Sequence, residues 1–159
     1  MVFEGSTIQA STEVRVAEVV EPSAGFLAWY RESRSDFGER EELGEPVVEQ
    51  LYRRDIEVFL PRGLRFFVGF VDGEMAGQTT LFGIHGIGYI DSVVTRPEFR
   101  RRGVATSTIL RAVEASVERG DELVHLLAVK DGPAARLYER LGFRVKAEIV
   151  TFTHPLIRD

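Results

Sequence analysis

Residues 89–120, YIDSVVTRPEFRRRGVATSTILRAVEASVERG, decide the fold of this chain. Tyr89 to Thr95 is rich in β-branched and apolar residues, which predicts a buried strand. Pro97 then ends the strand, because proline has no N–H to donate to a neighbouring strand. A short basic turn, Arg100 to Ala105, leads directly into a helix. The stretch therefore predicts a strand, a tight turn and a helix in succession.

The helix after this turn is predicted from the spacing of its apolar residues. They recur every four positions on one face, at Ile109, Val113 and Val117. The opposite face is predicted to be polar, with Ser107, Arg111, Glu114 and Glu118. Gly120 follows at the place where many helices end in a left-handed residue. We therefore expect an amphipathic helix with one face packed against a sheet.

The turn between strand and helix is predicted to bind a phosphate group. The first N–H groups of a helix have no partner within it, and the peptide dipoles add roughly half a positive charge there. Small residues at Gly103 and Ala105 let a phosphate approach the backbone, and three arginines add charge: Arg100, Arg101 and Arg102. The spacing matches neither the GxxxxGK[ST] loop of nucleoside-triphosphate sites nor the GxGxxG of dinucleotide sites.

Two motifs resemble those of the GNAT superfamily of N-acetyltransferases. The pattern Arg100-x-x-Gly103-x-Ala105 resembles the family's acyl-CoA signature, which has Gln or Arg, two residues, Gly, one residue, and Gly or Ala. Residues 131–143, DGPAARLYERLGF, resemble its later motif, in which Asn, Ala, Leu-Tyr and Gly-Phe recur at these offsets. The two motifs occur in the family's order, and together they cover residues 65–150 of the expected fold.

The resemblance implies a single α/β (α+β) domain over residues 1–159, with a mixed, twisted central sheet of six to seven strands and helices on both faces. It also implies an enzyme that transfers the acetyl group of acetyl-CoA, its co-substrate, to a primary amine of a small molecule or a peptide. One alternative is a non-catalytic acyl-CoA-binding sensor or partner module. A second is a nucleic-acid-binding protein that uses the three arginines.

The resemblance also assigns positions to the bound coenzyme. Backbone N–H groups from Arg101 to Thr106 would contact its diphosphate, and the backbone of Val94 and its neighbours would pair with the pantetheine arm. The N–H of Val94 would stabilise the oxyanion. Asp131 stands where the family has Asn, and capping of the next helix is its alternative role. The predicted coenzyme-binding residues are Val93, Val94, Thr95, Arg100, Arg101, Arg102, Gly103, Val104, Ala105, Thr106, Asp131 and Ala134.

Two residues are predicted to move protons. The resemblance makes Tyr138 the general acid, since a phenol with an ordinary pKa near 10 is protonated at neutral pH; the alternative is an aromatic ring packed beside Leu137 and Leu141. Asp91 is the candidate general base, directly or through a water, and the alternative is a sheet residue that faces solvent. Weaker candidates are Glu122, His85, His125 and His154. Nothing groups the histidines with carboxylates at metal-ligand spacing, so no metal is predicted.

The remaining segments predict further elements. Strands are expected at residues 13–20, 65–71, 75–82, 122–129 and 143–153. Helices are expected after an N-cap at Ser23, over residues 46–60 and over residues 133–141. Residues 1–12 are small and polar and are expected to fray. The acidic loop within residues 33–45 is expected to be solvated, with attraction of a cationic acceptor as the alternative.

The composition is that of an ordinary globular protein. Of its 159 residues 44% are hydrophobic and 28% are charged, and the net charge of −5 argues against a general nucleic-acid binder. The lack of cysteine excludes disulfides and cysteine nucleophiles. There is no run of eighteen apolar residues and no signal-like start, which predicts a cytoplasmic protein without a membrane partner. The last strand is the expected place for a homodimer contact.

Overall fold

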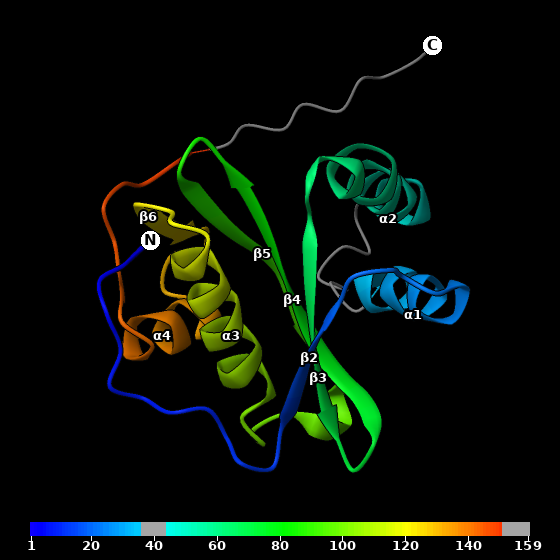
Figure 1. The fold of residues 1–159 in the computed structure, drawn as a ribbon, viewed down its shortest axis with the longest axis horizontal. Helices are drawn as coiled ribbons and strands as arrows, with labels where there is room; N and C mark the ends of the chain where they lie inside the picture. The colour runs from blue at the N-terminus through cyan, green and yellow to red at the C-terminus, as the bar shows by residue number, and fades with distance from the viewer. Residues whose placement is uncertain (36–43, 151–159) are drawn as a thin grey trace.

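The computed structural model describes residues 1–35 and 44–150, which form a seven-stranded mixed sheet with helices on both faces (Figure 1). The strand order across the sheet is β2-β3-β4-β5-β6-β1-β7. Neighbouring strands are antiparallel except β5 and β6, which are parallel. The strands are β1 (Val2–Phe3), β2 (Arg15–Val19), β3 (Arg65–Val71), β4 (Glu74–Ile84), β5 (Ile87–Thr95), β6 (Leu123–Leu126) and β7 (Phe143–Arg144). The predicted fold class is confirmed.

The helices lie in two layers, with α1 and α2 on one face of the sheet and α3 and α4 on the other (Figure 1). Their bounds are α1 (Ala24–Ser35), α2 (Gly44–Arg53), α3 (Val104–Glu118) and α4 (Pro133–Arg140). A π-helical turn, Arg54–Phe59, and a 3-10 turn, Leu60–Arg62, continue α2 toward β3, and a second 3-10 turn, Pro97–Phe99, precedes α3. The hydroxyl of Ser23 accepts the N–H of Phe26, which confirms Ser23 as a cap of α1.

Each face of the sheet has its own hydrophobic core. Beneath α3 and α4, Phe67 of β3 and Ile90 of β5 are buried with residues of both helices. Beneath α1, Tyr30 is fully buried against Phe66 of β3, with the two rings in an edge-on contact 5.0 Å apart. Burial of one such side chain contributes about 1.5–3 kcal/mol. The two cores therefore fix both helix layers to the central strands.

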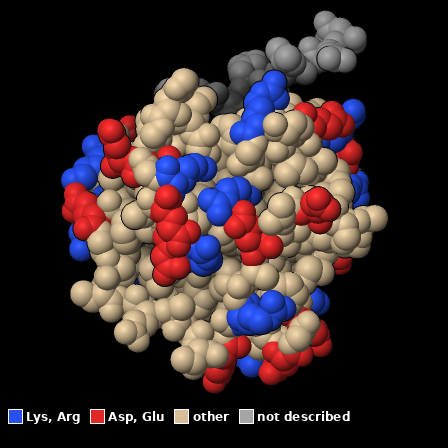
Figure 2. Space-filling model, viewed as in Figure 1, with Lys and Arg blue, Asp and Glu red and all other residues tan. Residues whose placement is uncertain are grey.

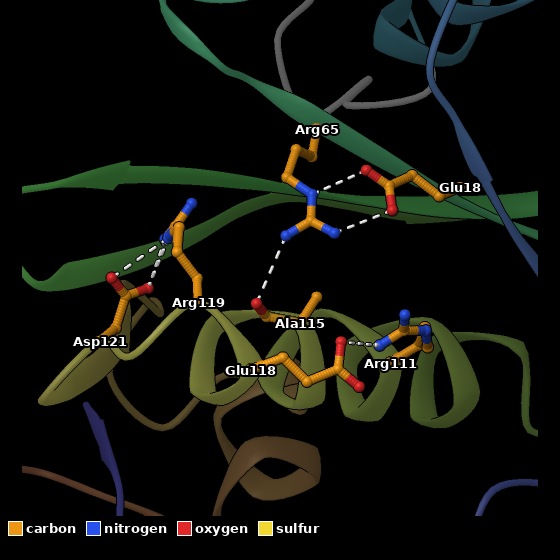
Figure 3. Close-up of polar contacts among 7 residues, drawn as sticks. All are labelled: Glu18, Arg65, Arg111, Ala115, Glu118, Arg119 and Asp121. Carbon is orange, nitrogen blue, oxygen red and sulfur yellow. Dashed lines mark hydrogen bonds and ion pairs between the residues drawn. The ribbon is translucent and has the colours of Figure 1, made fainter.

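Charged side chains connect the C-terminal half of α3 to the sheet (Figure 3). Arg65 of β3 donates two hydrogen bonds to Glu18 of β2, from Nε to Oε1 (2.7 Å) and from Nη2 to Oε2 (2.8 Å). Its Nη1 donates to the carbonyl oxygen of Ala115 in α3 (3.3 Å). The hydrogen bond from Arg65 lowers the pKa of Glu18 below its ordinary value. One guanidinium thus joins two strands and a helix.

Two residues of α3 do not lie as the spacing predicted. Val117 is 59% exposed, although it was assigned to the apolar face. A four-residue step advances a helix by more than one turn, so a residue eight positions after Ile109 has moved off the buried face. Ser107, assigned to the polar face, is buried because the N-terminal segment covers it, and its Oγ accepts the N–H of Ser11 (3.0 Å).

The N-terminal residues were expected to fray, and this is wrong. Val2 and Phe3 form β1 between β6 and β7, where Val2 lies opposite His125 and Phe3 opposite Phe143. The Phe3 and Phe143 rings also meet edge-on, 5.3 Å apart. A strand of two residues is too short to show the alternation from which strands are predicted.

The other element bounds differ at their ends. The strand predicted at residues 122–129 ends at Leu126, and of residues 143–153 only Phe143–Arg144 forms a strand, while residues 151–153 lie outside the described residues. β4 and β5 are longer than predicted, because their turn consists only of His85 and Gly86, both with positive φ. Within residues 1–35 and 44–150, no helix has the length and apolar character required to cross a membrane.

Candidate active site

β5 and β6 separate at the end of the sheet where the site was predicted. They pair in parallel from Ile87 opposite Leu123 to Ile90 opposite Leu126, where β6 ends. β5 continues to Thr95, so none of the strands in the described ranges lies beside its last residues on that side. Ser92, with φ +52°, marks an irregularity in the pairing with β4 at this point. The backbone of Val93 to Thr95 is therefore available to an extended ligand.

The N-terminus of α3 follows β5 closely and has no side-chain cap. Its N-cap residue is Gly103, which is left-handed with φ +84°. The N–H of Ser107 bonds to the carbonyl oxygen of Gly103 (2.9 Å), so the N–H groups earlier in this turn precede the helical hydrogen bonds. These groups and the helix dipole favour an anion. The local geometry thus fits the predicted diphosphate site.

The three arginines of the turn point to different partners. Arg102 donates to Asp72 in the β3–β4 turn (Nη2–Oδ2 3.2 Å) and lies 4.0 Å from a carboxylate oxygen of Glu13. Arg100 donates from Nε to the carbonyl oxygen of Thr95 (3.4 Å), and Arg101 is exposed. Neither has an acidic partner within the described part of the chain. Arg100 and Arg101 are therefore better placed than Arg102 to neutralise a phosphate.

Tyr138 of α4 is 7% exposed, and its ring meets that of Phe143 at 6.2 Å. Burial, and secondly the negative charge of Asp91, raise the pKa of Tyr138 to about 12. The hydroxyl makes no hydrogen bond to any described residue. The ring of Tyr138 is thus packed in the core, as the alternative to a catalytic role expected. Its raised pKa also means that the hydroxyl is protonated at neutral pH.

Asp91 lies on β5 just beyond the last residue paired with β6. It is opposite Thr80 of β4, whose Oγ1 donates to the carbonyl oxygen of Asp91 (2.9 Å). Its side chain is 43% exposed and faces Arg54, with 3.9 Å between Oδ2 and Nη2. The negative charge of Asp91 is also a secondary cause of the raised pKa of Tyr138.

The family model described as the acetyltransferase (GNAT) family matches residues 26–143, which is most of the chain. The chain belongs to the GNAT family. The matched segment extends from α1 to the first residue of β7, and it includes the separated strands and the N-terminus of α3. The resemblance read from the two motifs is confirmed.

Curated relatives with acetyltransferase names match parts of this GNAT chain. An acetyltransferase of Pectobacterium atrosepticum is 32% identical over 97 residues, which are 59% of this chain and 67% of that protein. An N-alpha-acetyltransferase of Saccharolobus solfataricus is 32% identical over 97 residues, 52% of this chain and 58% of the relative. An uncharacterised N-acetyltransferase of Methanocaldococcus jannaschii is 38% identical over 58 residues, 36% of this chain and 26% of the relative. The similarity spans only part of each relative.

Solved structures share the fold over nearly the whole GNAT chain. A transcriptional regulator from Bacillus halodurans has a TM-score of 0.70 at 23% identity and covers 89% of this chain and 99% of its own. An aminoglycoside acetyltransferase from an uncultured soil sample, in complex with sisomicin, has a TM-score of 0.68 at 17% identity. The match covers 91% of this chain and 97% of that chain. A predicted acetyltransferase from Clostridium acetobutylicum, crystallised with acetyl-CoA, has a TM-score of 0.67 at 17% identity. The match covers 88% of this chain and 96% of that chain. At these identities the likeness shows the fold alone.

Asp131 does not have the capping role that was its alternative. The N-cap of α4 is Gly132, and no side chain caps this helix. Pro133 occupies the first turn of α4, which leaves Asp131 one position too early, with φ +60°. Both Asp131 and Ala134 are exposed, and their predicted contacts with the coenzyme remain predictions.

The weaker candidates for the general base lie away from Tyr138. His85 is in the β4–β5 turn and Glu122 precedes β6, at the opposite end of these strands from Thr95. The ring of His125 stacks on Tyr89 at 4.9 Å, and burial lowers the pKa of His125. His154 and most of the acidic loop lie outside the described residues. Among the residues that are described, no three metal-ligating side chains lie together.

A buried carboxylate near the site was not predicted. Asp55, in the π-helical turn, has a side chain that is only 3% exposed; it accepts the hydroxyl of Tyr30 (2.5 Å) at Oδ2 and the guanidinium of Arg54 at Oδ1 (2.8 Å from Nη2). The sequence contained one signal: Asp55 stands midway between Leu51 and Phe59 at four-residue spacing, on the face predicted to be apolar.

Proposed function

We propose that this chain is an acetyl-CoA-dependent N-acetyltransferase that acts on a primary amine. Family membership supports the reaction class. The observation that carries the proposal is that the edge of β5 freed where β6 ends is followed along the chain by the uncapped N-terminus of α3.

The residues present fit the acyl donor. Backbone N–H groups from Gly103 to Thr106, with Arg100 and Arg101, would hold the diphosphate. The backbone of Val93 to Thr95 would pair with the pantetheine arm as an added strand does, and the N–H of Val94 would face the thioester oxygen. When bound, acetyl-CoA supplies an activated acetyl group and a thiol leaving group.

Tyr138 and Asp91 would move the protons of this reaction. Asp91 accepts a proton from the amine, directly or through a water, so that the nitrogen lone pair becomes available. Tyr138 holds the proton that the departing sulfur takes up when the C–S bond breaks and the C–N bond forms. Its raised pKa keeps this proton in place at neutral pH.

Thiol release in the presence of acetyl-CoA and a panel of amines tests the proposal, with titration calorimetry to measure binding of acetyl-CoA. We expect binding in the micromolar range and release that depends on an amine. A protein that binds acetyl-CoA but releases no thiol with any amine is the sensor module instead. A protein that gives no heat with acetyl-CoA contradicts both readings.

One observation favours the sensor alternative: Asp131 replaces the family's Asn and is exposed without capping α4. Nothing comparable favours a nucleic-acid binder. Arg102 already donates to Asp72. On the face of the molecule that Figure 2 shows, acidic and basic side chains are intermixed and form no broad basic patch. A failure to bind DNA or RNA at low salt would remove that reading.

We further propose a cytoplasmic location and a homodimer formed through the last strand. β7 is an edge strand of the sheet formed by the described residues, and the backbone of an edge strand can pair with a second copy. Apolar side chains in the segment after β7 are exposed, including Ile149 and Val150. Light scattering after size-exclusion chromatography tests the dimer, and a monomer at every concentration would contradict it.

A further inference from the structure

We propose that the acceptor is a free α-amino acid, whose carboxylate binds Arg54 and whose ammonium group binds Asp91. This inference rests on the proposed acetyltransferase function and names the substrate class of the same site. It depends on the contacts that hold Arg54, on the position of Asp91 beside it, and on the residues that surround Arg54 and Asp91.

Arg54 is held in one orientation by several contacts. Its Nε and Nη2 donate to Oδ1 of the buried Asp55 at 3.0 and 2.8 Å, and Tyr30 fixes that carboxylate from the other oxygen. The guanidinium also lies over the ring of Phe59, 5.1 Å from its centre. Its Nη1 has no hydrogen-bond acceptor among the described residues. A planar cation that is already ordered loses little entropy when it binds a carboxylate.

The position of Arg54 follows from the π-helical turn Arg54–Phe59. Such turns are rare, and they frequently occur at functional sites. In this turn two successive side chains point in different directions. Asp55 is buried in the core, while Arg54 extends toward Asp91 of β5. A buried carboxylate without a cation would be costly, so Asp55 and Arg54 stabilise each other as a unit.

Arg54 and Asp91 present opposite charges side by side. Their Nη2 and Oδ2 atoms are 3.9 Å apart, and the two side chains are 39% and 43% exposed. An ion pair this open contributes little to stability, and its length leaves both groups short of full hydrogen bonding. In an α-amino acid a single carbon separates the ammonium from the carboxylate. Such a zwitterion satisfies both partners at once, and the ammonium then lies beside the proposed base.

The surroundings fit the rest of an amino acid. Half-buried Phe59 and Phe82 stack 4.9 Å apart on this side of the sheet and offer apolar contact for a side chain. Gln78 lies on the same face, two residues from Thr80, and is fully buried, with no described partner for its Nε2 or Oε1. An unpaired buried amide is unfavourable, and a polar group of the acceptor would pair with it.

Matched acceptors test the inference: leucine, leucinamide and 3-methylbutylamine share a side chain and differ only at the carboxyl position. We expect kcat/KM for leucine, measured by thiol release, to exceed both others at least tenfold. The test is stringent because leucinamide has the largest fraction of unprotonated amine at neutral pH. A parallel series built on phenylalanine shows whether the preference belongs to the carboxylate or to one side chain.

Variants identify the residue responsible. Arg54→Gln should bring the ratio of leucine to 3-methylbutylamine toward 1, chiefly through a higher KM for leucine. Arg54→Lys keeps the charge that Asp55 requires but loses the planar fork, so an intermediate ratio is expected. Arg53→Gln is the matched control, because Arg53 is exposed and, among the described residues, its side chain bonds to Glu57 alone (2.8 Å); its ratio should equal that of the wild type. Circular dichroism and acetyl-CoA binding show that each variant is folded.

The outcomes separate the two proposals. Equal or faster turnover of the amine or the amide overturns the amino-acid inference and leaves the acetyltransferase function standing. A preference for leucine that survives in folded Arg54→Gln also overturns it. Absence of thiol release with any amine refutes the proposed function and the inference together.

Discussion

Tyr138 is the residue on which the proposed reaction depends most directly. Its ring is part of the core beneath α3 and α4, while its hydroxyl has no described hydrogen-bond partner. Burial and the charge of Asp91 both favour the protonated phenol. A packed ring with a free hydroxyl is suited to a proton donor that must keep a fixed position.

Replacing Tyr138 by Phe should lower kcat at least tenfold, because the departing sulfur then lacks its proton donor. The fold and the Kd for acetyl-CoA should change little, since the substitution removes no described hydrogen bond. Stopped-time assays of thiol release and calorimetry measure the two quantities. Unchanged turnover would remove Tyr138 from the mechanism.

The same pKa predicts a pH profile. A pKa raised from 10 to about 12 means that Tyr138 keeps its proton as the pH rises through the range of ordinary assays. The plot of kcat against pH from 6 to 10 should therefore show no decline due to loss of this proton. A decline with a midpoint below 10 that is absent from the residual activity of Tyr138→Phe would contradict this assignment.

Glu18 gives a prediction about stability. Its pKa is lowered in the fold by Arg65, so its contribution is present above the ordinary value of 4.5 and is lost as the pH falls through the folded-state value. Glu18→Gln should lower the free energy of unfolding by about 1–2 kcal/mol at pH 7. Urea denaturation should show this difference shrinking as the pH is lowered to 3.

Glu114→Gln is the control for this measurement. Glu114 also faces an arginine, Arg111, but at 3.7 Å and with a side chain that is 66% exposed. Its loss should change the free energy of unfolding by less than about 0.5 kcal/mol. Equal effects of the two substitutions would show that the bidentate contact with Arg65 has no special role.

At the scale of elements, α3 is positioned by the residue that precedes it. Gly103 adopts φ +84°, and a Cβ there would lie 2.7 Å from Cβ of Ser11. Gly120 at the other end of α3 has φ +89°, and a Cβ there would meet no atom within 4 Å. The two glycines therefore share a backbone requirement and differ in their surroundings.

Gly103→Ala should destabilise the chain by about 1–2 kcal/mol, because an alanine is strained at positive φ and must also displace Ser11. It should raise the Kd for acetyl-CoA at least fivefold by shifting the first turn of α3. Gly120→Ala is also strained at positive φ, but its Cβ displaces no neighbouring residue, so the Kd for acetyl-CoA should be unchanged. Equal Kd values for the two variants would argue against a diphosphate at this helix end.

The elements that the sequence predicted well are those whose periodicity is long enough to read. The strand before Pro97 and the helix after Gly103 lie where the pattern placed them. β1 could not be predicted because two residues carry no alternation and their partners are more than 120 positions away along the chain. The π-helical turn was also missed, although the five-residue step from Leu51 to Ile56 departs from the three- and four-residue steps of an ordinary helix.

The candidate site also contains residues that the sequence pointed to and residues that it did not. Positions within the two motifs, such as Gly103 and Tyr138, could be given predicted roles from the family resemblance. Arg54 and Asp55 could not, because their role arises from a contact between the turn after α2 and β5 that no local pattern reports. Arg102 was assigned to phosphate with its neighbours, and only the fold shows that Asp72 reaches it.

For the whole molecule, a bound coenzyme would contact β5, α3 and α4 together. Acetyl-CoA at 100 times its Kd should stabilise the folded state by about 2.7 kcal/mol. For a chain of this size this corresponds to a rise in Tm of roughly 5 to 10 °C. Pantetheine, which lacks the diphosphate, should give a much smaller shift at the same concentration. No shift with acetyl-CoA at millimolar concentration would contradict the site.

The position of β1 has a consequence for how the molecule is made. Among the described strands β7 borders β1 alone, and β1 lies between β6 and β7, so Val2 and Phe3 leave the ribosome before either partner strand has been made. This margin of the sheet can close only after Phe143 and Arg144 have been synthesised. Because α4 leads into β7, Tyr138 reaches its final position only after that step, and a nascent chain should form its proposed diphosphate-binding turn, residues 100–106, before it can turn over substrate.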